Sequence, residues 1–179
     1  SPVTQNKKQN GSLMTQSSTI NLNTGEILSY KETIIEKPTT LTIAQSGRKY
    51  LKYHDRLEDI NLSYLQRGYL WYLGNYIEYE TGRLTISKGQ GRNPIIIKKG
   101  EQLARLIGIG RKAAGTFKKK LIALNILFKI DNGYHINPTF IQRGAKFPVE
   151  VAEDMMFHDK EFKNWVSKKV LYKLKQFKK

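Results

Sequence analysis

Residues 100–137 have the sequence GEQLARLIGIGRKAAGTFKKKLIALNILFKIDNGYHIN and decide the fold class that we expect. The pattern predicts a short helix, a turn flanked by glycines, a second helix rich in lysine and then a tight hairpin. This order of elements is the layout of a winged helix-turn-helix, which places its second helix in the major groove of DNA. The sequence therefore predicts an α+β fold built around such a motif.

Apolar residues at steps of three and four define the inner faces of the two predicted helices. These residues are Leu103, Ala104 and Ile107 in the first helix and Ala114, Phe117, Leu121 and Leu124 in the second. Gly108 permits a left-handed turn, and Gly110 takes the N-cap position of the second helix. Gly115 costs about 1 kcal/mol relative to alanine inside a helix. Close approach of the helix backbone to DNA and a packing need explain this glycine equally well.

A hairpin is predicted after the second helix, with residues 126–130 pairing with residues 134–136 across Asp131-Asn132-Gly133. An Asn-Gly pair between alternating apolar runs is the strongest short-range hairpin signal. This hairpin is the wing of the motif, and Ile95-Ile96-Ile97 is expected to enter the sheet beside it.

Basic side chains concentrate in this part of the chain, where residues 98–129 contain nine Lys/Arg and one Glu. Arg111 can pair with guanine through two hydrogen bonds, and Thr116 can contact a phosphate or a thymine methyl group. Lysines suit phosphates as mobile point charges. The predicted DNA-binding residues are Arg111, Lys112, Thr116, Lys118, Lys119 and Lys120 on the second helix and Lys129, Asn132, Tyr134 and His135 in the wing.

Composition supports a polyanionic partner, with 31 Lys+Arg against 15 Asp+Glu and a formal net charge of +16. Neutralising phosphates releases condensed counterions, so such a surplus favours nucleic acid. No apolar run approaches the roughly 18 residues that span a bilayer, and the first residues lack the apolar core of a signal peptide. We expect a cytoplasmic protein without a membrane partner. The chain has no cysteine, which excludes disulfides and thiolate zinc sites.

Three regions are expected along the chain. Residues 1–18 are polar and aperiodic, which predicts a disordered tail. Residues 19–144 are expected to form the winged-helix DNA-binding domain, beginning with a β-hairpin around Asn23-Thr24-Gly25. Residues 145–179 are predicted to be a basic amphipathic helical tail that forms a dimer face, a lid on the core or a second electrostatic DNA contact.

Further elements are expected inside the domain. Residues 41–43 are expected to form a short strand, and the spacing of apolar residues over 47–60 suggests a helix or extended helical turns. A strongly apolar core helix is predicted over 63–77, with Ser63 as its N-cap. Its inner stripe is predicted to be Leu62, Leu65, Tyr69, Leu73 and Tyr76, widened by Leu70 and Ile77.

Three parts of the chain resemble the RepL-type replication proteins of small Gram-positive plasmids and related phage proteins. These parts are the hairpin with Asn23-Thr24-Gly25-Glu26-Ile27, the helix-turn-helix, and the ending YHINPTFIQRG at residues 134–144, where Asn137-Pro138 and Arg143-Gly144 are most specific. The resemblance covers roughly residues 20–145. It implies a winged-helix protein that initiates replication at an origin. A transcriptional regulator of a mobile element is the alternative, with host replication or transcription proteins as further partners.

The final phrase also has an explanation from its own residues. Pro138 is expected to open a new turn or helix after the wing. Arg143-Gly144 is expected to end a helical turn or, as the alternative, to contact a phosphate.

Nothing in the sequence predicts catalysis, a cofactor or a metal site. His54, His135 and His158 lie far apart, and the chain has no phosphate-binding loop. The pair Glu153-Asp154 is better explained as a solvated helix start than as metal ligands. We therefore expect a protein that is not an enzyme.

Two alternatives come from other functional classes. One is a protein-interaction or dimerisation module. The other is RNA binding, because aromatic residues between lysines can stack on bases; the candidates are Tyr50, Tyr53, Tyr69 and Tyr72. A homodimer is expected because many winged-helix proteins bind repeated or palindromic sites.

Overall fold

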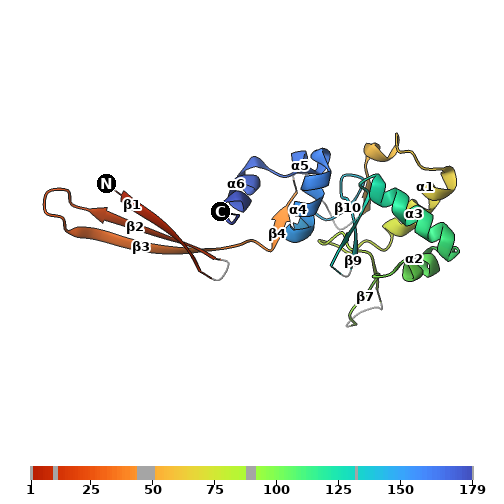
Figure 1. The fold of residues 1–179 in the computed structure, drawn as a ribbon, viewed down its shortest axis with the longest axis horizontal. Coiled ribbons are helices and arrows are strands. Elements are labelled where there is room, and N and C mark those ends of the chain that lie inside the picture. The colour runs from red at the N-terminus through yellow and green to blue at the C-terminus, as the bar shows by residue number, and fades with distance from the viewer. Residues whose placement is uncertain (1, 10–11, 44–50, 88–91, 132, 179) are drawn as a thin grey trace. The chain divides into compact units, whose positions relative to one another are not determined.

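The computed structural model describes residues 2–9, 12–43, 51–87, 92–131 and 133–178 (Figure 1). Helices and strands are mixed along the chain, as expected for an α+β protein. The chain divides into two compact units, one of residues 1–39 with 168–179 and the other of residues 40–167. These boundaries differ from the predicted ones after residues 18 and 144. No helix in the described residues is both long enough and apolar enough to cross a bilayer.

The first unit contains an antiparallel sheet of β1 (Pro2–Gln9), β2 (Ser12–Ile20) and β3 (Ile27–Glu36), in that order, and the helix α6 (Lys168–Gln176). The prediction of a disordered tail over residues 1–18 is therefore wrong. That prediction rested on the low content of large apolar residues. An antiparallel ladder pairs the backbone N–H and C=O groups by hydrogen bonds whatever the side chains are. The central strand β2 pairs with a neighbour on each edge.

The turn between β2 and β3 confirms the predicted hairpin. Gly25 has a φ of 71°, and its N–H donates to the Asn21 carbonyl at 2.8 Å. The Asn21 side-chain oxygen accepts from the Asn23 N–H at 3.0 Å, which is a local Asx turn. The strands extend further on both sides than the sequence predicted.

The described residues of the second unit form eleven α-helices and strands before the last two helices. In chain order these are β4 (Thr40–Thr42), β5 (Leu51–Tyr53), α1 (Tyr64–Gly74), β6 (Thr85–Ile86), β7 (Ile95–Ile96), α2 (Gly100–Ile107), α3 (Arg111–Ala123), β8 (Leu127–Ile130), β9 (Gly133–Ile136), β10 (Ile141–Arg143) and β11 (Lys146–Pro148), with a 3₁₀ helix in addition at Asp55–Leu57. They are followed by α4 (Val149–His158) and α5 (Lys160–Trp165). The antiparallel pairs are β4–β11, β5–β10, β6–β7 and β8–β9.

The segment before β6 borders the β8–β9 hairpin. Leu84 N–H donates to the Tyr134 carbonyl at 2.8 Å, and Ile136 N–H donates to the Gly82 carbonyl at 2.8 Å. Residues Ile95–Ile96 pair with β6 rather than with the hairpin. The isoleucine triplet therefore lies one strand further from the hairpin than predicted.

The helix α1 confirms the predicted N-cap and most of the predicted inner stripe. Ser63 Oγ accepts from the Gln66 N–H at 3.2 Å, and Gln66 Oε1 accepts from the Ser63 N–H at 3.2 Å, which is a capping box. The buried face carries Leu70 and Leu73. Tyr69 and Tyr76 pack against the core, and Leu65 is the stripe residue that is exposed, contrary to the prediction.

The helix predicted over residues 47–60 is wrong for the residues that the structure describes. Residues 44–50 lie outside the described residues, Leu51–Tyr53 form a strand, and only Asp55–Leu57 form a 3₁₀ turn. The strand exists because residues far along the chain, β10, supply its hydrogen-bonding partner. Periodicity within one segment carries no information about such a partner.

The main core lies between α1, α2, α3 and the β8–β9 hairpin (Figure 1). Its fully buried members include Leu73, Leu103, Phe117, Leu121 and Ile126. The inner faces predicted for α2 and α3 are therefore confirmed for these side chains. Burying a leucine or phenylalanine contributes about 1.5–3 kcal/mol.

The region after residue 144 is not a single helical tail. It contains β11 and three helices, and the part up to residue 167 belongs to the second unit. Phe147 and Phe162 are buried, with ring centroids 5.9 Å apart. Residues 146–166 thus pack as part of the domain.

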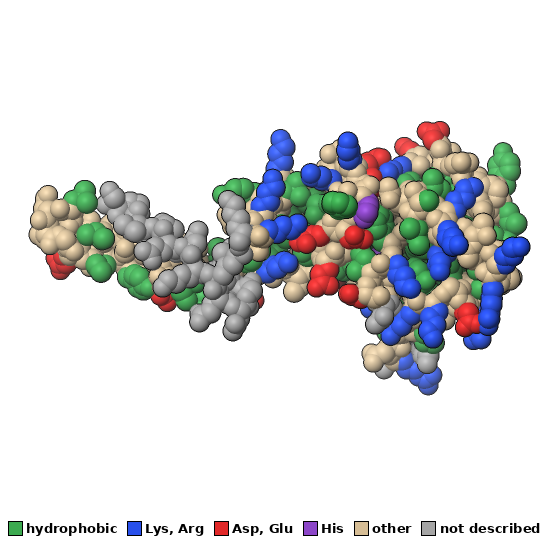
Figure 2. All heavy atoms as spheres, viewed as in Figure 1, with side chains coloured by type: hydrophobic (Ala, Val, Ile, Leu, Met, Phe, Trp, Pro, Cys, Tyr) green, Lys and Arg blue, Asp and Glu red, His purple; other side chains and the backbone are tan. Residues whose placement is uncertain are grey.

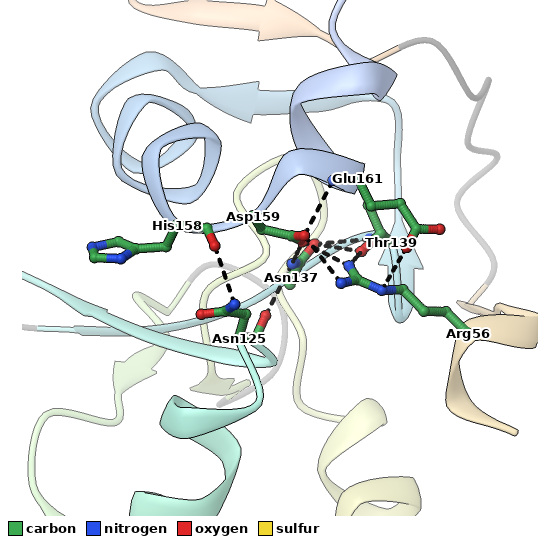
Figure 3. Close-up of polar contacts among 7 residues, drawn as sticks. All are labelled: Arg56, Asn125, Asn137, Thr139, His158, Asp159 and Glu161. Atoms are coloured by element: carbon green, nitrogen blue, oxygen red, sulfur yellow. Dashed lines mark hydrogen bonds and ion pairs between the residues drawn. The ribbon is translucent and has the colours of Figure 1, made fainter. Parts of the chain in front are cut away.

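Arg56 lies at the centre of a polar cluster that joins three segments (Figure 3). Its guanidinium donates to both Asp159 carboxylate oxygens, at 2.6 and 3.0 Å, and to Thr139 Oγ1 at 2.6 Å. Asn137 Nδ2 donates to the same carboxylate at 2.6 Å and to the Asn125 carbonyl at 2.9 Å. The cluster links the 3₁₀ helix, the chain after β9 and the start of α5.

The Asn137-Pro138 and Arg143-Gly144 pairs have structural roles. Asn137 Oδ1 accepts from the Thr139 N–H at 3.0 Å, so a turn, and no helix, opens at Pro138. Arg143 lies on β10, and its Nη1 donates to the Ile77 carbonyl at 2.9 Å. The expectation that Arg143-Gly144 ends a helical turn is therefore wrong.

Candidate nucleic-acid interface

The turn between α2 and α3 has the predicted backbone. Gly108 adopts a left-handed conformation with φ of 79°, and its N–H donates to the Ala104 carbonyl at 2.9 Å. Gly110 is the N-cap of α3, with φ of −67° and ψ of 155°. A left-handed residue ends α2 at low cost because glycine has no Cβ. The turn fixes the direction in which α3 leaves α2.

One face of α3 anchors the helix and the opposite face is exposed. Ala114, Phe117 and Leu121 are buried against the core. The exposed residues of the helix are Arg111, Lys112, Ala113, Thr116, Lys119, Ile122 and Ala123. The solvent side of α3 is therefore cationic and held in position by its own inner side.

The lysines of α3 fall into two groups. Lys112 and Lys119 are exposed, and within the part of the chain that the structure describes neither side chain has an ion pair or hydrogen bond. Lys120 Nζ donates to Gln66 Oε1 on α1 at 3.1 Å, and the half-buried Lys118 ammonium lies beside Gly100. Lys112 and Lys119 are thus the two lysines of α3 that are most available to a phosphate.

Arg111 and Thr116 also lie on the exposed side, each with a partner. Arg111 is 79% exposed and forms an ion pair with Glu101 of α2. An exposed ion pair contributes only about 0–1 kcal/mol, so a guanine or a phosphate can displace it. Thr116 Oγ1 donates to the Lys112 carbonyl at 3.1 Å.

Gly115 lies within α3 beside open space. A Cβ at this position would meet no atom within 4 Å, apart from the backbone of its own helix. The explanation of Gly115 as a packing need is therefore wrong. The glycine leaves the helix surface flat between Lys112 and Lys119.

The predicted wing contacts are corrected by burial. Tyr134 is 0% exposed and His135 is buried, so neither side chain reaches the surface. Both lie on β9, which is covered by the chain before β6. Lys129 is exposed, and Asn132 lies outside the described residues.

His135 is held as a neutral side chain. Burial disfavours the imidazolium and lowers the pKa of His135, while a hydrogen bond to the Thr81 carbonyl at 3.0 Å opposes that shift in part. The wing therefore gains no positive charge from this residue near neutral pH.

Further basic residues extend the surface beyond the predicted set. Lys98, Lys99, Arg105 and the more distant Arg92 are exposed. Lys98 and Lys99 belong to the basic run that is visible in the sequence, but the helix-turn-helix pattern predicts DNA contacts for the second helix and the wing. Figure 2 shows Lys and Arg side chains spread over the region of α2 and α3, with few acidic groups among them.

The tyrosines proposed to stack on RNA bases are mostly engaged within the protein. Tyr53 stacks on Trp71 with ring centroids 3.8 Å apart, and Tyr69 packs edge-on against Phe117 at 5.5 Å. Tyr72 is partly exposed, and Tyr50 lies outside the described residues. The three described tyrosines therefore do not form a row of free rings.

Within the described ranges, no group of three or more His, Asp or Glu side chains is arranged to hold a metal ion. Comparison of the chain with known protein families, with curated proteins and with solved structures finds no match.

Proposed function

We propose that residues 40–167 form a winged helix-turn-helix domain that binds double-stranded DNA with α3 in the major groove. One observation carries the proposal. The outer face of α3 presents Arg111, Lys112 and Lys119 around the bare backbone of Gly115, while the inner face is anchored in the core.

The N-terminal end of α3 suits contact with DNA. Its first N–H groups and the helix dipole favour an anion there, and Arg111 and Lys112 add two formal charges at the same end. Because α3 begins at an exposed glycine cap, no side chain of the cap blocks this approach. Arg111 is proposed to contact a base edge, and Lys112, Lys119 and Lys129 are proposed to contact phosphates.

Such binding depends steeply on salt. Three phosphate contacts correspond to a slope of about −2.7 for log affinity against log salt concentration. The affinity then falls about fortyfold between 50 and 200 mM salt. A surface that contacts a neutral partner has no such dependence.

The biological role that we propose is initiation of replication at an origin of a plasmid or phage. The resemblance to RepL-type proteins supports this role, and regulation of transcription on a mobile element remains the second candidate. Footprinting on the parent replicon separates the two, because an initiator protects the origin whereas a regulator protects a promoter.

The double substitution Lys112→Ala/Lys119→Ala tests the DNA contact. We expect weaker duplex binding and a salt slope reduced by about 1 for each lysine, measured by fluorescence anisotropy at several salt concentrations. Lys163→Ala, at an exposed lysine of α5, is the matched control and should leave both quantities unchanged. An unchanged salt slope in the double variant would refute the placement of α3 on DNA.

A further inference from the structure

The solvent side of α1 carries a continuous apolar stripe. Tyr64, Leu65, Trp71 and Tyr72 are 94%, 66%, 62% and 42% exposed, and Gly68 lies between them. Their spacing of about one and two helical turns places them on one side of the helix. We call these five residues the α1 outer face.

The α1 outer face has no charge, although the chain has a net charge of +16. The nearest cation on the helix is Arg67, whose guanidinium donates to the backbone carbonyls of four residues. These are Leu57, Glu58, Ile60 and Leu62. A stacking platform for single-stranded nucleic acid combines aromatic rings with a basic groove, and α1 lacks the basic part.

The same face has both projections and a gap. Gly68 is exposed, and a Cβ there would meet no atom within 4 Å outside its own helix backbone. The gap lies about one turn from Tyr64 on one side and from Trp71 and Tyr72 on the other. A surface that meets a copy of itself across a two-fold axis must be self-complementary, and adjacent knobs and gaps satisfy this condition.

Two aromatic side chains of the face, Trp71 and Tyr72, are held in place before any partner binds. The capping box at Ser63 fixes the start of α1, and Trp71 is stacked on Tyr53 with an interplanar angle of 9°. Tyr72 and Tyr76 are joined by a hydrogen bond of 2.9 Å between their hydroxyl groups. Ordering these side chains on association therefore costs little conformational entropy.

The area is sufficient for a small specific interface. An aromatic side chain buries about 150–250 Å² when it is fully covered. Scaled by their exposed fractions, Tyr64, Trp71 and Tyr72 together offer on the order of 400 Å² on each copy. Together with Leu65 and the backbone at Gly68, two copies remove on the order of 1,000 Å² from water, the lower limit for a specific interface.

We propose that the α1 outer face is the contact between two copies of this chain, which form a two-fold dimer with their α1 helices crossing at Gly68. The absence of charge explains why the partner is a second copy, since two strongly cationic chains associate best through an uncharged face. The dimer does not depend on DNA binding, so its tests are carried out without DNA.

Sedimentation equilibrium of the full chain measures the dimer directly. The substitution pair Tyr64→Glu/Leu65→Glu places acidic residues in the first turn of α1, where they favour the helix, but it introduces charge into the contact. We expect the dimer dissociation constant to rise by at least about thirtyfold, as for loss of an interface hot spot. Phe157→Glu, at an exposed aromatic residue of α4, is the matched control and should leave the constant unchanged.

A single cysteine gives a second, independent measurement. The chain contains no cysteine, so Gly68→Cys introduces its only thiol at the proposed crossing point. Mild oxidation should convert this variant to a covalent dimer much faster than Phe157→Cys. Equal rates of disulfide-linked dimer formation for the two variants would overturn the proposal. So would a wild-type chain that stays monomeric in sedimentation equilibrium at 100 times the protein concentration used in the DNA-binding titrations.

Discussion

The substitution Asp159→Ala tests the polar cluster around Arg56. Asp159 is only 4% exposed, and its carboxylate accepts hydrogen bonds from Arg56 and Asn137 (Figure 3). It also caps α5 by accepting from the Glu161 N–H at 3.2 Å. Removing it leaves the Arg56 guanidinium without its shortest carboxylate partner and takes from Asn137 Nδ2 one of its two acceptors.

The magnitude follows from these contacts. Breaking a buried ion pair by removing one partner costs about 3–5 kcal/mol, and losing an N-cap costs about 1 kcal/mol. Arg56 offsets part of this loss, because it keeps some contact with solvent and its bonds to Thr139 and Glu161. We therefore expect the free energy of unfolding to fall by about 3 kcal/mol.

Urea unfolding of the full chain, followed by circular dichroism, measures this change. Asp154→Ala is the matched control, because Asp154 is exposed and lies 3.7 Å from His158 in a surface pair. It should change the free energy of unfolding by less than about 0.5 kcal/mol. Equal effects of the two substitutions would show that the cluster does not hold α5 on the domain.

The same residue gives a dependence on pH. Burial by itself raises the pKa of Asp159, but the hydrogen bonds from Arg56 and Asn137 outweigh burial, so the pKa is lowered from its ordinary value. The contribution of Asp159 to stability is complete above the pKa of an aspartate in the unfolded chain, about 3.9. It is lost as the pH falls through the lower pKa that Asp159 has in the folded protein. The stability difference between wild type and Asp159→Asn should therefore shrink below about pH 4.

Substitutions at three further positions separate stability from DNA binding. Gly115→Ala should raise the free energy of unfolding by up to about 1 kcal/mol because the site is open, whereas Gly115→Leu should stay folded but weaken duplex affinity in an anisotropy titration. Glu101→Gln should strengthen duplex binding a few-fold at low salt, since it releases Arg111 and removes a negative charge, with no gain at high salt. Tyr134→Phe should leave duplex affinity unchanged, because Tyr134 is buried. It should also raise the free energy of unfolding by about 1 kcal/mol, because the Tyr134 hydroxyl has no hydrogen-bond partner among the described residues. Weaker DNA binding by this variant would restore Tyr134 as a wing contact.

Elements with a local cause could be predicted from sequence. Ser63 with Gln66 forms a cap within four residues, and Gly108 adopts the left-handed turn that only glycine adopts easily. The β8–β9 hairpin forms where its sequence indicates, although Gly133 pairs with Ile130 instead of lying in the turn. In each case the interacting groups lie within a few residues of one another.

Elements that depend on distant partners could not be predicted. The strand Leu51–Tyr53 looked helical by spacing, and it is extended because β10 pairs with it. Tyr134 looked like a wing contact by its place in the hairpin, but the chain before β6 covers it. The cluster of Arg56, Asn137 and Asp159 joins residues up to 103 positions apart, and no local pattern signals it.

The sequence by itself determined the α2–turn–α3 segment, the hairpin after it and the positive charge of the second helix. These follow from helical periodicity, glycine geometry and composition, which are properties of short segments. Only the tertiary structure decided which of the charged residues remain free, that Gly115 lies beside open space, and that α1 keeps an apolar face in solvent. The physical reason is that exposure is set by which elements pack together, and packing joins residues that are far apart in the chain.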